Sequence, residues 1–320
     1  MKPVTARIHP ETSSAKSVTA HAKLLNTWAE MREAGDGSWV TRICLELTAE
    51  PARSQISPVT RLPNGDYDLR IVLAGTSLVM AEDDILVADG LLRKVGVSDG
   101  GDGTVELRVI LEHPATPTRD DIPGLPHTTR FTFPRDGVRD VFRGKRIGID
   151  PGHGGKDFGI RGPVNLLEKD TSLAVALELR DLLSTAGATP ILTRDRDIPL
   201  SDADRVSILR EAGAELCVQI HACGVDDPLV QLYRIFEKPE CAASAILGRK
   251  LTEAFFERMG MRLMDSGPLE PSESMPCPTV RVEPLCLTYF SDEANFRAPL
   301  FRKRTAQAIF NGIHRFLRQR

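Results

Sequence analysis

The apolar residues of the chain follow two different periodicities, one in each half. In the first half, apolar and polar residues alternate, which is typical of strands with one buried and one solvated face. Glycine, proline and aspartate turns separate these segments. The alternating segments are residues 39–47, 66–73, 104–111 and 128–133. We therefore predict a small antiparallel β-sandwich domain over residues 36–136.

An earlier segment, residues 15–34, shows a spacing that is typical of a helix. Its recurring apolar side chains are Leu24, Leu25, Trp28 and Met31. We predict a short amphipathic helix within an N-terminal extension, residues 1–35.

In the second half, short apolar runs alternate with helical patterns. The predicted strands are residues 146–150, 189–193, 216–221, 232–236 and 279–283. The predicted helices are residues 171–186, 202–212, 242–259 and 299–317. This alternation indicates an α/β domain over residues 146–320, with a mostly parallel sheet and helices on both faces. Residues 137–145 are predicted to link the two domains, because the stretch from Pro134 to Lys145 is charged and interrupted by proline and glycine.

Composition excludes several classes of partner. The net charge is -3, and basic and acidic groups are nearly balanced in each half, so a nucleic-acid partner is not expected. No apolar run approaches the roughly 18 residues of a transmembrane segment. The first 34 residues lack the apolar core of a signal peptide. Either the protein acts in the cytoplasm as written, or an export signal has been removed.

Six cysteines are present, without a CxxC pair, so a structural zinc ribbon is not expected. Scattered buried thiols are one interpretation. In an exported protein, one disulfide such as Cys277 with Cys286 is the other, and both stay open.

Four polar side chains stand at positions where a parallel sheet gathers its ligands. His153 follows the first predicted strand, and His221 and Glu283 end the third and the fifth. Glu168 precedes the first helix. The carboxyl ends of parallel strands meet at one edge, so these residues are expected to converge. Two histidines and a carboxylate form a common catalytic zinc set, and a further carboxylate can move protons. Any one of these histidines alone could be a hydrogen-bonded core residue.

The local sequences around these residues resemble one enzyme family. In chain order they are Asp150-Pro-Gly-His-Gly-Gly155, Glu168-Lys169, Thr193-Arg194-Asp195 with Arg205, Ile220-His221-Ala222 and Pro278-Thr-Val-Arg-Val-Glu283. The set, which covers about residues 144–320, resembles the zinc-dependent N-acetylmuramoyl-L-alanine amidases of the amidase-3 family.

The resemblance implies one zinc ion per chain, bound by His153, Glu168 and His221. It implies that Glu283 is the general base, and that the amide between N-acetylmuramic acid and L-alanine of peptidoglycan is hydrolysed. Such a substrate implies action outside the cytoplasm, in the periplasm or cell wall. Two alternatives stay open: a zinc peptidase or amidase on another peptide, and a degenerate, non-catalytic protein that binds the cell envelope.

Two segments beside the expected site depart from the family pattern. Cys223 stands where asparagine is usual, and Pro284-Leu-Cys286 replaces a Gly-Phe pair and an asparagine. Either altered substrate preference or lost activity would follow. Cys223 is also a candidate metal ligand, because it lies two residues past His221 and would keep the same face of a strand. Arg194 and Arg205 are expected to brace the fold.

The strand pattern of the first half resembles an AMIN domain, a β-sandwich that accompanies bacterial cell-wall amidases. It implies a targeting module with a ligand in the cell envelope. A generic β-sandwich without a ligand is the alternative.

Overall fold

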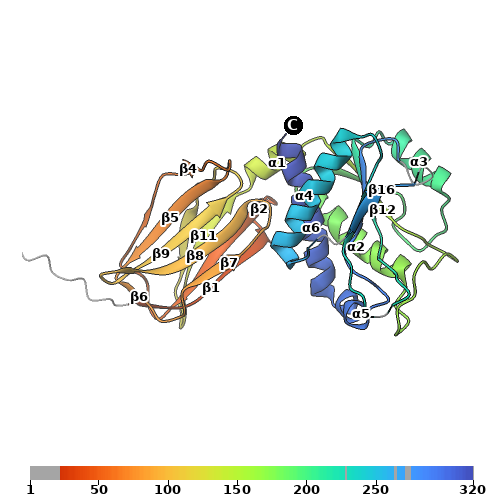
Figure 1. The fold of residues 1–320 in the computed structure, drawn as a ribbon. Coiled ribbons are helices and arrows are strands. Elements are labelled where there is room, and N and C mark those ends of the chain that lie inside the picture. The colour runs from red at the N-terminus through yellow and green to blue at the C-terminus, as the bar shows by residue number, and fades with distance from the viewer. Residues whose placement is uncertain (1–21, 228, 263–264, 271–274, 320) are drawn as a thin grey trace, which may run out of the picture.

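A β-rich region is followed by an α/β domain in the computed structural model of the protein (Figure 1). The structure describes residues 22–227, 229–262, 265–270 and 275–319. Among these residues, no helix is both long and apolar enough to cross a membrane. Strands β1 to β11 form the β-rich region, and the elements from β12 onward form the α/β domain.

Two sheets share one apolar core in the β-rich region. The first sheet, in the order β10-β11-β2-β1-β6, contains β1 (Ala22–Glu33), β2 (Trp39–Leu47), β6 (Thr76–Leu78), β10 (Thr118–Ile122) and β11 (His127–Pro134). The second, in the order β3-β5-β9-β8-β7 with β4 beside β5, contains β3 (Arg53–Ile56), β4 (Thr60–Arg61), β5 (Tyr67–Ala74), β7 (Asp83–Leu86), β8 (Leu92–Gly101) and β9 (Thr104–Leu111). Alternate side chains such as Leu45 and Leu107 are fully buried between the sheets. The paired strands are antiparallel, except that β1 runs parallel to β6.

The helix predicted within residues 15–34 is wrong for residues 22–33, which form strand β1. Residues 15–21 lie outside the described residues. The reason is a β-bulge between Leu24 and Asn26, where the register against β2 shifts by one residue. The extra residue breaks the alternation of buried and exposed positions, so the apolar spacing imitates that of a helix.

The segment predicted as a linker, residues 137–145, is mostly helical. Helix α1 (Asp136–Phe142) buries Val138 and Phe142, which are four positions apart and therefore share one face. The Phe142 ring stacks on Phe310 with centroids 4.8 Å apart. This short helix thus packs on the α/β domain rather than spanning a gap.

Buried polar contacts also join the two parts of the chain. Arg315 donates a hydrogen bond of 2.8 Å to Glu112, and both side chains are buried. Asn311 donates one of 2.8 Å to the carbonyl of Ala88. Charged groups are rarely buried unless they are paired, so these contacts fix the relative position of the two parts.

The α/β domain contains one sheet in the order β13-β12-β14-β17-β15-β16. Its strands are β12 (Arg146–Pro151), β13 (Thr189–Leu192), β14 (Leu216–Ile220), β15 (Arg234–Glu237), β16 (Asp265–Pro268) and β17 (Thr279–Glu283). The prediction of a mostly parallel sheet is confirmed, since only the pairing of β15 with β17 is antiparallel. Its helices are α2 (Glu168–Thr185), α3 (Asp202–Glu211), α4 (Ala242–Met259), α5 (Phe290–Arg297) and α6 (Pro299–Arg318).

Helices cover both faces of this sheet (Figure 1). Val218 of β14 lies in the large core with α2, α4 and α6, whereas its neighbour Cys217 packs with Leu209 of α3. Side chains alternate along a strand, so Gln219 and the following His221 are on the α3 side. Helix α5 and strand β16 were not predicted. Helix α5 buries the acidic Asp292 and Glu293, which hides its apolar periodicity.

Candidate metal centre

The turn that follows β12 holds His153 in an uncommon conformation. His153 has a backbone φ of 62°. Residues other than glycine rarely adopt this left-handed conformation, and those that do are often found at functional sites. The preceding residue, Gly152, has no room for a side chain, because a Cβ there would lie 2.2 Å from Cε1 of His221. The backbone of this turn can therefore approach the end of β14 closely.

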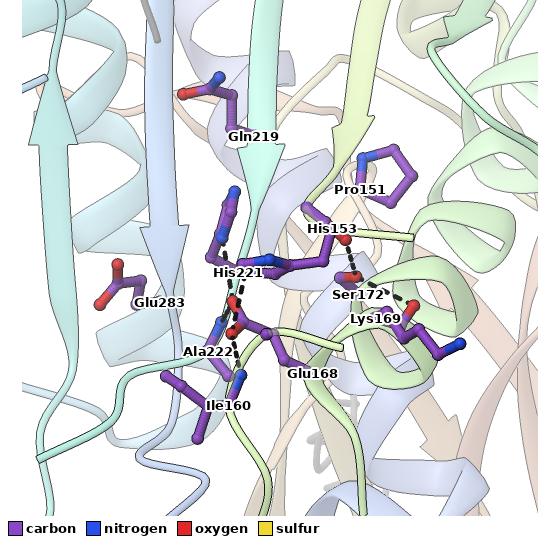
Figure 2. A network of polar contacts seen from close by, with 12 residues as sticks. Pro151, His153, Ile160, Glu168, Lys169, Ser172, Gln219, His221, Ala222 and Glu283 are labelled. Carbon is purple, nitrogen blue, oxygen red and sulfur yellow. Dashed lines mark hydrogen bonds and ion pairs between the residues drawn. The ribbon is translucent and has the colours of Figure 1, made fainter. Parts of the chain in front are cut away.

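Three of the residues expected from the sequence come together at this edge (Figure 2). Nε2 of His153 lies 3.0 Å from Oε2 of Glu168, and Nδ1 of His221 lies 2.9 Å from Oε1. The ligand atoms of the three residues are all within 4.8 Å of one another. They come from the ends of β12 and β14 and from the first turn of α2.

Glu168 is held in its charged form. Its oxygens accept hydrogen bonds of 3.0 Å from the amide of Ile160 and 2.9 Å from the amide of Ala222. Burial would raise the pKa of Glu168, but the hydrogen bonds with His153 and His221 outweigh it and hold the pKa well below its usual range. A carboxylate that is ionised and fixed in this way is suited to bind a cation.

Asp157 orients the first histidine from behind. Its Oδ2 lies 2.9 Å from Nδ1 of His153, and its Oδ1 accepts a hydrogen bond of 3.1 Å from the amide of Gly159. This contact directs Nε2 of His153 toward Glu168. Carboxylates placed behind metal-binding histidines commonly fix the ring and its tautomer.

The donor set fits zinc. Two imidazoles and one carboxylate match the ligands of catalytic zinc sites, which keep one position open. A cavity of about 140 Å³, lined by His153, His221, Arg205 and Gln219 among others, adjoins the histidines and can admit a substrate group. Within the described residues, no other group of histidine, cysteine, aspartate or glutamate side chains has this geometry.

Glu283 lies on the neighbouring strand, outside the group of three. Figure 2 shows it on β17, on the opposite side of His221 from His153. Its Oε2 accepts a hydrogen bond of 2.7 Å from Nε of Arg234, the residue paired with it on β15. Burial raises the pKa of Glu283, and the charge of Arg234 opposes this rise. Sequence reasoning missed Arg234, because the antiparallel direction of β15 has no local signal.

Arg194 and Arg205 brace the turn around His153, as expected. Arg194 is buried and donates hydrogen bonds of 2.7 Å to the carbonyl of Gly152 and 2.8 Å to that of Lys169. Arg205 donates one of 2.6 Å to Asp150 and one of 2.8 Å to the carbonyl of His153. These contacts hold backbone carbonyls in place and explain how the strained turn persists.

Cys223, which the sequence left as a candidate metal ligand, lies outside the group of His153, Glu168 and His221. Its sulfur lies 3.3 Å from that of Cys286. The sequence also left open a pairing of Cys277 with Cys286, but in the structure Cys286 contacts Cys223 instead. Cys277 packs with Cys217 in a separate apolar cluster.

Comparison with known proteins decides the family. Residues 147–315 match the amidase-3 family, which is described as N-acetylmuramoyl-L-alanine amidase. The chain belongs to this family. The matched range begins in β12 and ends in α6, so all the site residues of this amidase-3 chain lie within it.

Individual relatives agree with the family match. The chain is 30% identical over 181 residues to the amidase LytC of Bacillus subtilis. This alignment covers 55% of this chain and 36% of LytC. It is 37% identical over 111 residues to AmiA of Escherichia coli, which covers 34% of this chain and 38% of AmiA. The matches thus span little more than a third of these curated relatives. Among solved structures, the amidase AmiC2 of Nostoc punctiforme has a TM-score of 0.52 and 28% identity, covering 55% of this chain and 98% of that one.

Proposed function

We propose that this amidase-3 chain is a zinc-dependent N-acetylmuramoyl-L-alanine amidase. It would hydrolyse the amide between the lactyl group of N-acetylmuramic acid and L-alanine in peptidoglycan. The observation that carries the proposal is the convergence of His153, Glu168 and His221, with the buried carboxylate of Glu283 at the end of the next strand. The family match and the names of the relatives support the choice of substrate.

The three converging residues would hold one zinc ion, which supplies a Lewis acid beside the substrate carbonyl. Glu283 would act as general base and take a proton from the attacking water. The water oxygen then bonds to the carbonyl carbon, the C–N bond breaks, and Glu283 returns the proton to the amine of L-alanine. Arg234 would favour the ionised form of Glu283 before the reaction, and Asp157 would keep the His153 ring in position.

Digestion of purified peptidoglycan sacculi tests this reaction. The purified protein with zinc is expected to release muropeptides with new L-alanine amino termini, whereas Glu283→Gln is expected to release almost none. New amino termini other than L-alanine would instead show a zinc peptidase. New reducing sugar ends would show a glycosidase and overturn the proposal. A protein that binds no zinc and releases nothing would be a non-catalytic envelope-binding protein.

We also propose that the protein acts outside the cytoplasm, where its substrate lies, and that the β-rich region binds a component of the cell envelope. The support is the two-sheet arrangement and the resemblance of its strand pattern to an AMIN domain. The full chain with His153 and Glu168 both changed to alanine is expected to sediment with sacculi. Loss of sedimentation in this variant would place all the binding in the metal centre instead.

A further inference from the structure

Two cysteine side chains meet close in sequence to His221 and Glu283. The Sγ atoms of Cys223 and Cys286 are 3.3 Å apart, and both residues are fully buried. Cys223 lies two residues after His221, and Cys286 lies three residues after Glu283. The two sulfurs therefore connect the segments that leave the strands of the proposed metal ligand and the proposed general base.

The backbone already has the spacing that a disulfide needs. Cys223 and Cys286 form a parallel β-bridge. The amide of Cys223 donates a hydrogen bond of 2.8 Å to the carbonyl of Leu285, and the amide of Leu287 donates one of 2.7 Å to the carbonyl of Cys223. Neighbouring strands lie about 4.8 Å apart, within the range of Cα separations that disulfides span. A disulfide would bring the two sulfurs from 3.3 Å to about 2.05 Å apart.

The two sulfurs are not part of a metal-binding group. The adjacent residues Ala222, Leu285 and Leu287 pack with Phe296 in a separate apolar cluster. The hydroxyl of Thr288 lies 3.4 Å from Sγ of Cys286, and Asp292 accepts a hydrogen bond of 3.1 Å from the amide of Cys286. Arg234 and Glu283 lie near enough to Cys223 to interact with it electrostatically. The described residues place no histidine or carboxylate with these sulfurs in a metal-binding group. Two buried thiols in contact with each other, without a further metal ligand, are suited to a covalent cross-link.

The other cysteines offer no equivalent pair. Cys44 is buried in β2, and Cys241 precedes α4. Cys217 and Cys277 share an apolar cluster with Leu209. The described residues contain no second contact between sulfur atoms of the kind seen between Cys223 and Cys286.

We propose that Cys223 and Cys286 are a site of disulfide formation. Both S–H bonds break and one S–S bond forms. The two electrons and two protons pass to a disulfide oxidant, such as glutathione disulfide, which is reduced to two thiols. The cross-link joins positions 63 residues apart and encloses β15, α4, β16 and β17. Its formation does not depend on the proposed amidase activity.

The cross-link should stabilise the rim of the metal centre. Closing a long loop lowers the entropy of the unfolded chain. We expect the oxidised protein to unfold at a Tm about 5 °C or more above that of the reduced protein. The amide of His221 donates a hydrogen bond of 3.0 Å to the carbonyl of Val282, so the same pair of segments is already in register in the reduced form.

The test uses the full chain treated with glutathione disulfide, both in the native state and during refolding from denaturant, because buried thiols react slowly. Remaining thiols are then alkylated, and tryptic peptides are analysed by mass spectrometry. The peptide that carries Cys223 also carries Cys217, so fragmentation has to locate the cross-link. Cys286→Ala removes the proposed bond, and Cys44→Ala is the matched control at a buried cysteine in another part of the chain.

The expected result is a link between Cys223 and Cys286 in at least one of the two treatments, lost in Cys286→Ala and kept in Cys44→Ala. The Tm increase on oxidation should disappear in the same variant. Six free thiols after both treatments, or a link between any other pair, would overturn the proposal. A link that forms without raising the Tm would overturn the expected stabilisation alone.

Discussion

Arg234 and Glu283 face each other across β15 and β17, with Nε of Arg234 2.7 Å from Oε2 of Glu283. Glu283 is only 5% exposed. A carboxylate in such a place tends to take up a proton, and a general base has to be free of one. The guanidinium group counteracts this tendency from within hydrogen-bond distance. It is thus a positioning group for the proposed catalytic residue.

Replacement of Arg234 should change the pH dependence of the reaction. Without Arg234, the pKa of Glu283 rises further, so the acid limb of the pH–rate profile moves to higher pH. At a fixed pH on that limb, kcat should be about tenfold lower for each pH unit by which the limb has moved. Arg234→Met should show the full effect and Arg234→Lys a smaller one, with KM little changed. Arg180→Gln, at a partly exposed arginine on α2, is the control. An unmoved acid limb in Arg234→Met would refute this role.

Glu283→Gln should separate catalysis from metal binding. The amide cannot take a proton from water, so kcat should fall by about a hundredfold or more. Zinc content should stay at one ion per chain, because Glu283 lies outside the group of His153, Glu168 and His221. Elemental analysis and amine release from sacculi measure the two properties. Loss of zinc together with activity would instead make Glu283 a ligand.

Asp157→Asn should weaken metal binding without removing a ligand. The substitution weakens the contact that orients His153, and changes of this kind commonly cost ten- to a hundredfold in metal affinity. Competition with a chromophoric chelator measures the affinity. Asp195→Asn is the matched control, since Asp195 pairs with the adjacent Arg196 at 3.7 Å. Equal affinities in the two variants would show that Asp157 has no orienting role.

His113 should make the folded state sensitive to acid. Its Nε2 lies 2.7 Å from Nε2 of His314. Burial and the nearby His314 lower the pKa of His113 to about 3. The unfolded chain binds this proton near pH 6.5, so the stability from neutral His113 is complete above about pH 6.5 and is lost as the pH falls toward 3.

Urea unfolding at about pH 7 and about pH 5 measures this effect. The free energy of unfolding should fall with a contribution from His113 of at most about 1.4 kcal/mol per pH unit. His113→Gln should be less stable at about pH 7 and should lose this part of the slope. Equal slopes in the two proteins would contradict the prediction.

The sequence was informative where function requires a local pattern. The turn around His153 and the strand ends at His221 and Glu283 could be predicted, because an apolar run followed by a polar residue marks the carboxyl end of a parallel strand. The long-range pairings could not. Arg234 meets Glu283 only because β15 runs antiparallel to β17, and nothing in the sequence of β15 indicates the direction of this strand.

The wrong prediction for strand β1 has the same cause, a contact between residues far apart in the sequence. Its bulge at Leu24 and Asn26 is defined by pairing with β2, so the residues of β1 alone gave the wrong periodicity. Helix α1 was missed because only two of its apolar residues, Val138 and Phe142, are buried against α6. In each case the deciding contact is far away in the sequence.

The buried pair of Glu112 and Arg315 ties the β-rich region directly to helix α6 of the α/β domain. If the β-rich region holds on to the cell wall, the metal centre cannot swing on a tether to reach substrate. It would act mainly on bonds near the point of attachment. Each attachment would then give access to few bonds, and continued digestion would require the protein to detach and bind again.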